Sequence, residues 1–221
     1  MNAAPMKLLS LNVGEPRDVE WRGQTIRTAI YKAPAEGRLE LRGVNLAGDD
    51  QADRRVHGGR DKAVYAYPHE HYAFWKGELP DYEFTMGNFG ENLTTQGLLE
   101  DQVNIGDEYR IGSAVLTVTQ PRMPCAKLGL RFERDDMVKR FMNSRRPGIY
   151  FSVRSEGHMG AGDEIEKVHE DPHGVTVLDV LALAVFDKKN EEGLARALMV
   201  PALASGWRDD FEDRLRKLRM E

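Results

Sequence analysis

The stretch IGDEYRIGSAVLTVTQPRMPCAKL, residues 105–128, decides the fold class and carries the most informative side chain of the chain. Two short runs at 108–112 and 114–120, rich in β-branched and aromatic residues, flank a turn near Gly112-Ser113. Such runs around a glycine turn are typical of a β-hairpin. The second run leads into a proline-rich loop that holds Cys125, the one cysteine in the sequence. The stretch therefore predicts a hairpin followed by a loop with a single thiol.

Further strand-like runs lie on both sides of this hairpin. They cover residues 8–13, 25–31, 38–44, 63–67, 149–153 and 164–168. In the run at 25–31, Ile26, Thr28 and Ile30 are two apart and so share one face of a strand. Many short strands separated by glycine-rich turns predict a barrel or a sandwich. Two helices should interrupt them, one beginning at Pro68 and one over about residues 133–143.

After residue 171 the pattern becomes helical. Thr176 followed three residues later by Asp179 resembles a capping box, and Asn190 is placed to cap a second helix. A third helix carries one apolar stripe, which consists of Trp207, Phe211, Leu215 and Leu218. We therefore expect a mainly β (α+β) domain over residues 1–170 and a three-helix extension over residues 171–221.

Composition limits the class of protein. The 221 residues are 41% hydrophobic and 30% charged, which is typical of a soluble globular protein. The net charge of −5 argues against a nucleic-acid polymer as partner, and no apolar run reaches the ~18 residues of a membrane helix. The start of the chain is interpreted as a first strand and not as a signal peptide. A single cysteine cannot form an internal disulfide, so we expect a cytoplasmic protein.

Cys125 stands on a stiff, cationic loop. Pro121 and Pro124 each fix φ, and Arg122 and Lys127 supply positive charge that favours a thiolate. The thiolate is the form that binds metals and attacks electrophiles. The alternative is that a lone cysteine is simply a small buried apolar residue. No C-x-x-C motif is present, which excludes dithiol redox chemistry.

The segment VHGGRDKAVYAY, residues 56–67, is a candidate anion site. Gly58 and Gly59 allow backbone amides to approach an anion closely, and His57, Arg60 and Lys62 add positive donors. The alternative is an ordinary Gly-Gly turn that leads into a strand. The spacing of a Walker phosphate-binding loop is missing.

The segment NFGENLTTQGL, residues 88–98, is rich in polar side chains. Glu91, Asn92, Thr94 and Thr95 could bind the hydrogen-bonding edge of a ligand. They could equally form a turn that satisfies itself, because asparagine and threonine commonly bond their own backbone.

In this order, VHGGRDKAVYAYPHEHY, FGENLTTQGL and IGDEYRIGSAVLTVTQPRMPCAKL resemble the MOSC family, named for the C-terminal domain of molybdenum cofactor sulfurases. With the later GIYFSV and AGDEIE segments, the resemblance covers about residues 5–168. The tail, with ALMVPALASGWRDDFEDRLRK, resembles the three-helix extension of the YiiM-like bacterial subgroup. The implied fold is a MOSC-type β-barrel with peripheral helices, plus a small C-terminal three-helix unit.

The resemblance also implies a cofactor. Cys125 would be the ligand of molybdenum in a pterin-based molybdenum cofactor, for which a soft thiolate is suitable. By analogy, the pterin or its phosphate would be held by His57, Gly58, Gly59 and Lys62. Asn92 and Arg122 would lie close to the metal or the substrate.

The implied reaction is the reductive removal of oxygen from N-hydroxylated compounds, such as hydroxylaminopurine bases. Cys125 and His57 would be its catalytic residues. The proton would come from His57, whose unperturbed pKa is near neutral, or from a water-fed carboxylate such as Glu91. The sequence shows no dinucleotide, flavin or iron–sulfur motif. We therefore expect the electrons from a separate reductase, a flavoprotein or a ferredoxin system.

Two alternatives stay open at this point. One is a carrier of sulfur or cofactor, in which Cys125 bears a persulfide; the other is a non-catalytic cofactor-binding module. Pyridoxal phosphate is not expected, because the β-rich region begins almost at residue 1 and leaves no room for a preceding desulfurase domain. The oligomeric state is open. The C-terminal helices either complete the core or dock the electron donor.

Overall fold

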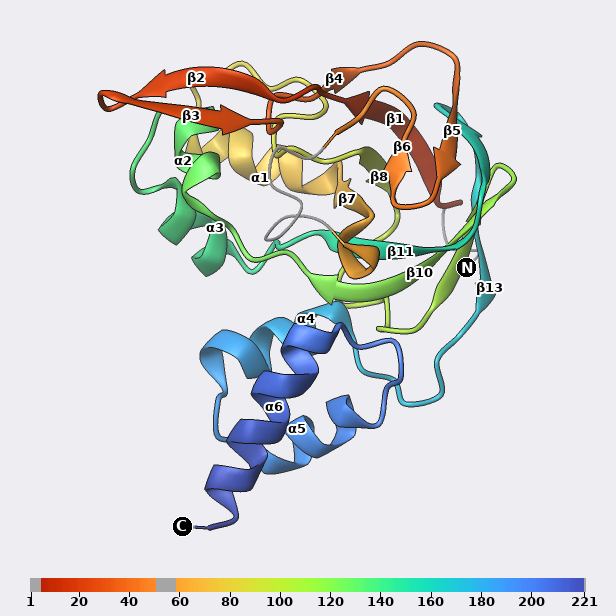
Figure 1. Ribbon diagram of the computed structural model, residues 1–221, viewed down its shortest axis with the longest axis vertical. Coiled ribbons are helices and arrows are strands. Elements are labelled where there is room, and N and C mark those ends of the chain that lie inside the picture. The colour runs from red at the N-terminus through yellow and green to blue at the C-terminus, as the bar shows by residue number, and fades with distance from the viewer. Residues whose placement is uncertain (1–4, 51–58, 221) are drawn as a thin grey trace.

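The computed structural model describes residues 5–50 and 59–220, and its main element is a curled eight-stranded sheet (Figure 1). The strands of this sheet are β1 (Lys7–Val13), β4 (Ala33–Pro34), β7 (Val64–Pro68), β8 (Leu93–Gln96), β9 (Glu108–Ile111), β10 (Ala114–Pro121), β11 (Ile149–Ser155) and β13 (Ile165–His169). Their spatial order is β13-β9-β10-β11-β7-β8-β1-β4. Neighbours are antiparallel, except that β7 and β8 run parallel. The prediction of a β-rich α+β fold is confirmed.

The curled sheet does not close completely into the barrel that the resemblance implied. Between the edge strands β4 and β13 the sheet stays open, although β1 approaches the segment before β13. There the amide of Leu8 donates to the carbonyl of Asp163 at 2.9 Å, and a single bridge joins Lys7 to Glu164. A turn with Gly162 at φ 94° interrupts the strand at this point. The pairing therefore ends before a continuous ladder can close the barrel.

The predicted hairpin at the centre of the sequence is confirmed. Strands β9 and β10 pair antiparallel, with Ala114 opposite Ile111, and Gly112 takes a positive φ of 61° in the turn. Two smaller sheets complete the β structure. They are the hairpin of β2 (Arg17–Trp21) with β3 (Gln24–Thr28), and the sheet of β12 (Gly157–Gly160), β5 (Arg38–Arg42) and β6 (Asn45–Leu46).

The helices within the first 170 residues differ from the prediction. Pro68 ends β7, where it lies opposite Thr95 in the parallel ladder, and α1 (Glu70–Glu78) begins after it. The helix expected over about residues 133–143 is α3 (Met137–Ser144), and an additional helix that was not expected, α2 (Ala126–Phe132), precedes it. Glu133, with φ 53°, ends α2 in the left-handed region. A short 3₁₀ turn, η1 (Arg60–Lys62), precedes β7.

An aromatic cluster lies between β7, α1 and α3. Tyr67, Trp75, Phe89 and Phe141 are buried there, and the indole Nε1 of Trp75 donates to the hydroxyl of Tyr67 at 2.7 Å. Figure 1 shows α1, α2 and α3 beside the β2–β3 hairpin, at one end of the main sheet. The cluster therefore packs α1 and α3 against β7, the strand that follows η1.

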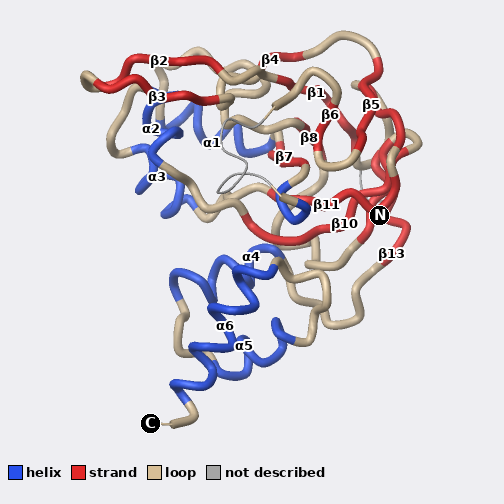
Figure 2. The backbone as a smooth tube through the Cα atoms, in the orientation of Figure 1, coloured by secondary structure: helices blue, strands red, loops and turns tan. Residues whose placement is uncertain are grey.

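The C-terminal extension consists of α4 (Val177–Leu181), the π-helical turn η2 (Ala182–Phe186), α5 (Glu191–Leu198) and α6 (Ser205–Leu218) (Figure 2). The capping box of Thr176 with Asp179 is present, and the side chain of Asn190 caps α5. Phe211 and Leu215 are buried in the same hydrophobic cluster as the sheet residues. Where one folding unit ends and the next begins, expected near residue 170, stays a prediction. Among the described helices, none has the length and apolarity needed to cross a membrane.

Candidate functional site

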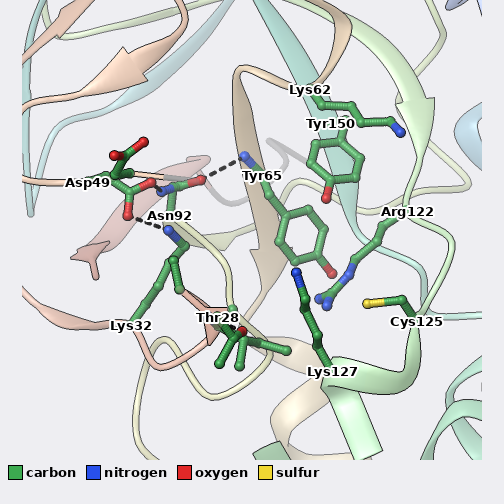
Figure 3. A pocket seen from close by; sticks show the side chains of 14 residues that line it. Thr28, Lys32, Asp49, Lys62, Tyr65, Asn92, Arg122, Cys125, Lys127 and Tyr150 are labelled. Carbon is green, nitrogen blue, oxygen red and sulfur yellow. Dashed lines mark hydrogen bonds and ion pairs between the residues drawn. The ribbon is translucent and has the colours of Figure 1, made fainter. Parts of the chain in front are cut away.

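One pocket brings together four of the residues singled out from the sequence. Lys62, Asn92, Arg122 and Cys125 all line it, although they come from three separate segments of the chain, with Arg122 and Cys125 on the same loop (Figure 3). The strand order explains why they meet. Strands β10, β11, β7 and β8 are consecutive neighbours in the sheet, and each of these residues lies just before or just after one of them.

The glycine segment is only partly at this pocket. Lys62 lines it, but Gly59 is exposed and lines a neighbouring hollow beside Trp207. Gly59 therefore does not line the pocket at Cys125, and its expected role in holding the pterin or its phosphate stays a prediction. Its φ of 96° shows why a glycine is needed there, since it begins η1 in a conformation that other residues rarely adopt. His57 and Gly58 lie outside the described residues, so their roles stay predictions.

Cys125 is held at the junction of β10 and α2. Its backbone is extended, with φ −123° and ψ 173°, and its carbonyl accepts the amide of Leu128 at 2.9 Å. The thiol makes no capping hydrogen bond to α2 and no disulfide, and the residue is partly exposed. Figure 3 shows its sulfur facing the same space as the guanidinium of Arg122 and the ammonium of Lys127. The alternative of a fully buried, inert cysteine is not supported.

Arg122 supplies a buried positive charge next to this thiol. Its guanidinium lies over the ring of Tyr65, 4.7 Å from the centroid, and donates to the carbonyl of Phe89. Burial acts to lower the pKa of Arg122, but interactions with Tyr65, Tyr150 and Cys125 outweigh it and raise that pKa above its ordinary value. Arg122 therefore stays charged, and a nearby cation favours the thiolate form of a cysteine.

The opposite wall of the pocket is built around Asp49. Its Oδ1 accepts the ammonium of Lys32 and the amide of Gly14, the latter at 2.9 Å, and its Oδ2 accepts the Nδ2 of Asn92 at 2.8 Å. The Oδ1 of Asn92 in turn accepts the amide of Tyr65 at 3.2 Å. Asn92 thus lies at the pocket as expected, but both ends of its amide are engaged by the protein. Its observed task is to join Asp49 to the start of β7.

Lys32 is a pocket residue that no sequence signal indicated. Its side chain is only 8% exposed, and burial lowers its pKa, although Asp49 offsets part of this effect. Asp49 was missed for the same reason, because it lies in a segment with no motif. Tyr65 and Tyr150 lie in the segments at 56–67 and 148–153, but neither was singled out as a site residue.

Glu91 is sealed inside the protein, so its proposed role as a water-fed proton source is wrong. It is fully buried, and its carboxylate accepts the hydroxyl of Tyr72, the amides of Gly87 and Phe89 at 2.8 and 3.0 Å, and the hydroxyl of Thr94 at 2.9 Å. Burial raises the pKa of Glu91, and these hydrogen bonds lower it in part. Glu91 organises the loop at 87–90 that leads to the pocket.

Gly87→Ala is expected to destabilise the protein strongly. Gly87 has φ 90°, and a Cβ atom there would lie 2.7 Å from the backbone oxygen of Lys32. Positive φ plus a clash with backbone should cost about 2–4 kcal/mol of unfolding free energy. Gly23→Ala is the matched control, because Gly23 has φ 73° with nothing within 4 Å, so only the conformational cost of about 1–2 kcal/mol remains. Equal losses in denaturant unfolding would contradict the steric part of this prediction.

Comparison with known families and proteins finds two matching regions. Residues 53–166 match the family described as the MOSC domain, and residues 175–218 match the family described as the YiiM-like 3-alpha helix domain. The chain is 41% identical to protein YflK of Bacillus subtilis over 211 residues, which are 94% of this chain and 95% of YflK. It is 36% identical to protein YiiM of Escherichia coli, over 85% and 84% of the two chains.

A solved structure and a fungal protein extend this comparison. The crystal structure of YiiM from Geobacillus stearothermophilus has a TM-score of 0.80 at 31% identity, covering 96% of this chain and 100% of that one. A protein of Gibberella moniliformis that is named a reductase is 34% identical over 179 residues. That match covers 80% of this chain but only 32% of the fungal protein.

Proposed function

Since the chain belongs to the MOSC family and carries the YiiM-like three-helix extension, we propose that it is a molybdenum-cofactor-dependent reductase of N-hydroxylated compounds, with Cys125 as molybdenum ligand. MOSC domains are associated with binding of the molybdenum cofactor. The observation that carries the proposal is the arrangement of the pocket, in which the thiol of Cys125 faces the cations Arg122 and Lys127.

The donor set of the pocket fits such a cofactor. A thiolate is a soft ligand suited to a molybdenum centre. The pterin part carries a phosphate, and the pocket offers the positive side chains of Lys62, Arg122 and Lys127 for an anion. The extended backbone at Cys125 and the ring of Tyr65 under Arg122 hold the thiol and the nearest cation in fixed positions.

Each residue then has a defined task. Cys125 would hold the metal, Arg122 would keep the thiolate charged, and Lys62 and Lys127 would bind the anionic part of the cofactor. When bound, the cofactor supplies two-electron reduction to the site. Asn92 would hold Asp49 in place relative to the start of β7, because it hydrogen-bonds both Asp49 and the amide of Tyr65.

The reaction and the electron donor rest on the resemblance to the YiiM-like group. The name of the fungal relative supports a reductive role for the shared region. Hydroxylaminopurine bases are the proposed substrates. A separate flavoprotein or ferredoxin system is the proposed donor of electrons.

The test is a reduction assay on protein from a host that makes the cofactor. Protein loaded with molybdenum should convert a hydroxylaminopurine base to the aminopurine when a flavoprotein reductase or a chemical reductant is supplied, as measured by chromatography. Protein from a host unable to make the cofactor is the control, and it should form no product. Cyanide-labile sulfur on Cys125 without any metal-dependent turnover would contradict the proposal and favour the sulfur carrier.

A further inference from the structure

The proposed reaction needs a proton at the oxygen that leaves. An N-hydroxylamine takes up two electrons and two protons, its N–O bond breaks, one proton goes to nitrogen and one to oxygen, and the oxygen leaves as water. The electrons come from the flavin or iron–sulfur reductase. A side chain within the pocket can supply the proton for oxygen as a general acid, and the sealed Glu91 is not placed to do so.

Lys32 has the geometry of such a donor. It lines the pocket from the wall opposite Cys125, and Asp49 fixes its ammonium by a direct ion pair between two buried side chains, 8% and 4% exposed. An ammonium has three donors, and this ion pair engages Asp49 Oδ1 as one acceptor. Asp49 is itself immobilised by Gly14 and Asn92, so the Lys32 ammonium is held towards the pocket.

We propose that Lys32, positioned by Asp49, is the catalytic acid that gives its proton to the oxygen of the N-hydroxylated substrate as the N–O bond breaks. This inference rests on the proposed function. After the transfer, Lys32 is a neutral amine beside the Asp49 carboxylate, and it regains a proton from solvent at the mouth of the pocket. An arginine in the same position would keep its proton and could not serve.

The surroundings make Lys32 a stronger acid than a lysine in water. Burial lowers its pKa most, Asp49 and Glu91 raise it in part, and the charge of Arg122 lowers it further. A pKa nearer to the working pH improves a general acid, because the proton is both present and readily given. The other charged groups at the same pocket are Asp50, Lys62 and Lys127.

Lys32→Arg tests the proposal directly. The variant keeps a cation beside Asp49, so the molybdenum content and the melting temperature should match those of wild type. The kcat for a hydroxylaminopurine should fall by about 100-fold or more, the range of a lost general acid. Lys167→Arg is the matched control, because Lys167 forms an ion pair with buried Asp107 at 2.9 Å, outside this pocket. It should leave kcat unchanged.

The pH dependence gives a second readout that a merely structural ion pair would not change. Wild-type kcat should fall as pH rises through the pKa of Lys32, because only the ammonium form donates. Asp49 raises that pKa, so Asp49→Asn should lower it and move the alkaline limb of the profile to lower pH. An unmoved limb in a folded, metal-loaded Asp49→Asn protein would count against Lys32.

An NMR titration separates this inference from the proposed function. The lysine side-chain resonances of cofactor-free protein are followed with pH, and Lys32→Arg identifies the Lys32 signal by its loss. Lys32 should titrate below the other lysines whether or not the protein reduces anything. A Lys32 that titrates with the surface lysines, or a Lys32→Arg enzyme with wild-type kcat and pH profile, would overturn the proposal.

Discussion

Cys125→Ser should remove the proposed reductase activity while leaving the fold intact. The thiol is partly exposed and forms no disulfide and no helix cap, so its replacement by a hydroxyl should change the unfolding free energy by less than about 1 kcal/mol. Replacing a residue that hydrogen-bonds a metal ligand typically lowers metal affinity or activity by about 10–100-fold. Replacing the ligand itself should therefore lower kcat by more than about 100-fold. The measurement is turnover of a hydroxylaminopurine alongside thermal unfolding.

Met123→Leu is the control for this prediction. Met123 lies on the same loop, is 39% exposed and does not line the pocket. It should leave turnover and melting temperature unchanged. A Cys125→Ser protein that turns over like wild type would show that the thiol is not part of the reacting centre.

Phe211→Asp should cause the largest loss of stability. Phe211 lies on α6 and is fully buried in the hydrophobic cluster that also contains residues of the main sheet. The centroid of its ring lies 5.8 Å from that of Trp207. Truncating a buried phenylalanine costs about 3–5 kcal/mol, and a buried carboxylate adds to this cost. We expect at least about 4 kcal/mol, or a melting temperature lower by roughly 8–16 °C for a chain of this size.

The effect should extend to the pocket at Cys125, because hydrogen bonds connect α6 to the segments next to that pocket. The indole Nε1 of Trp207 donates to Gln120 at 3.0 Å, and Gln120 donates to the carbonyl of Asp61 at 3.1 Å. Asp61 and Gln120 lie next to Lys62 and Pro121, respectively. Displacing α6 should therefore loosen both cationic segments of the pocket.

Lys217→Asp is the control, because it places the same carboxylate on the exposed face of α6 near its C-terminus. Its expected cost is below about 1 kcal/mol, from the helix dipole alone. If Phe211→Asp left the melting temperature unchanged and impaired only electron delivery from the reductase, the three helices would be a docking element and not part of the core.

The strand pattern could be predicted from sequence because strong local signals and tertiary structure agree. In the β9–β10 hairpin, β-branched residues flank a glycine that needs a positive φ, so turn and strands both follow from local chemistry. The capping box at Thr176 and the cap at Asn190 are local in the same way. Closure of the barrel is not local, since it depends on whether β1 and the segment before β13 meet in a continuous ladder.

The errors arise where tertiary contacts override local preference. Pro68 is suited to the first turn of a helix, but the parallel pairing of β7 with β8 includes it in a strand. The segment around Asn92 was expected either to bind the hydrogen-bonding edge of a ligand or to form a turn that satisfies itself. Here Glu91, Asn92 and Thr94 are buried and hydrogen-bonded, and the segment continues directly into β8.

The pocket residues also divide into those that local sequence signals mark and those that only tertiary contacts bring together. Cys125 and Arg122 could be found because prolines and cations mark their loop in the sequence. Lys32 and Asp49 could not, because nothing local distinguishes them and their ion pair joins segments that meet only in the folded chain. A single sequence therefore indicated the cationic wall of the pocket and, on the opposite wall, Asn92 but not Lys32 or Asp49.

Molybdenum content tests the central claim most directly. Wild type and Cys125→Ala are expressed in a host that makes the cofactor, and the metal is measured by elemental mass spectrometry per protein chain. The account predicts nearly one molybdenum per chain in wild type and almost none in Cys125→Ala. Equal molybdenum in both proteins, or none in wild type from a cofactor-replete host, would contradict it.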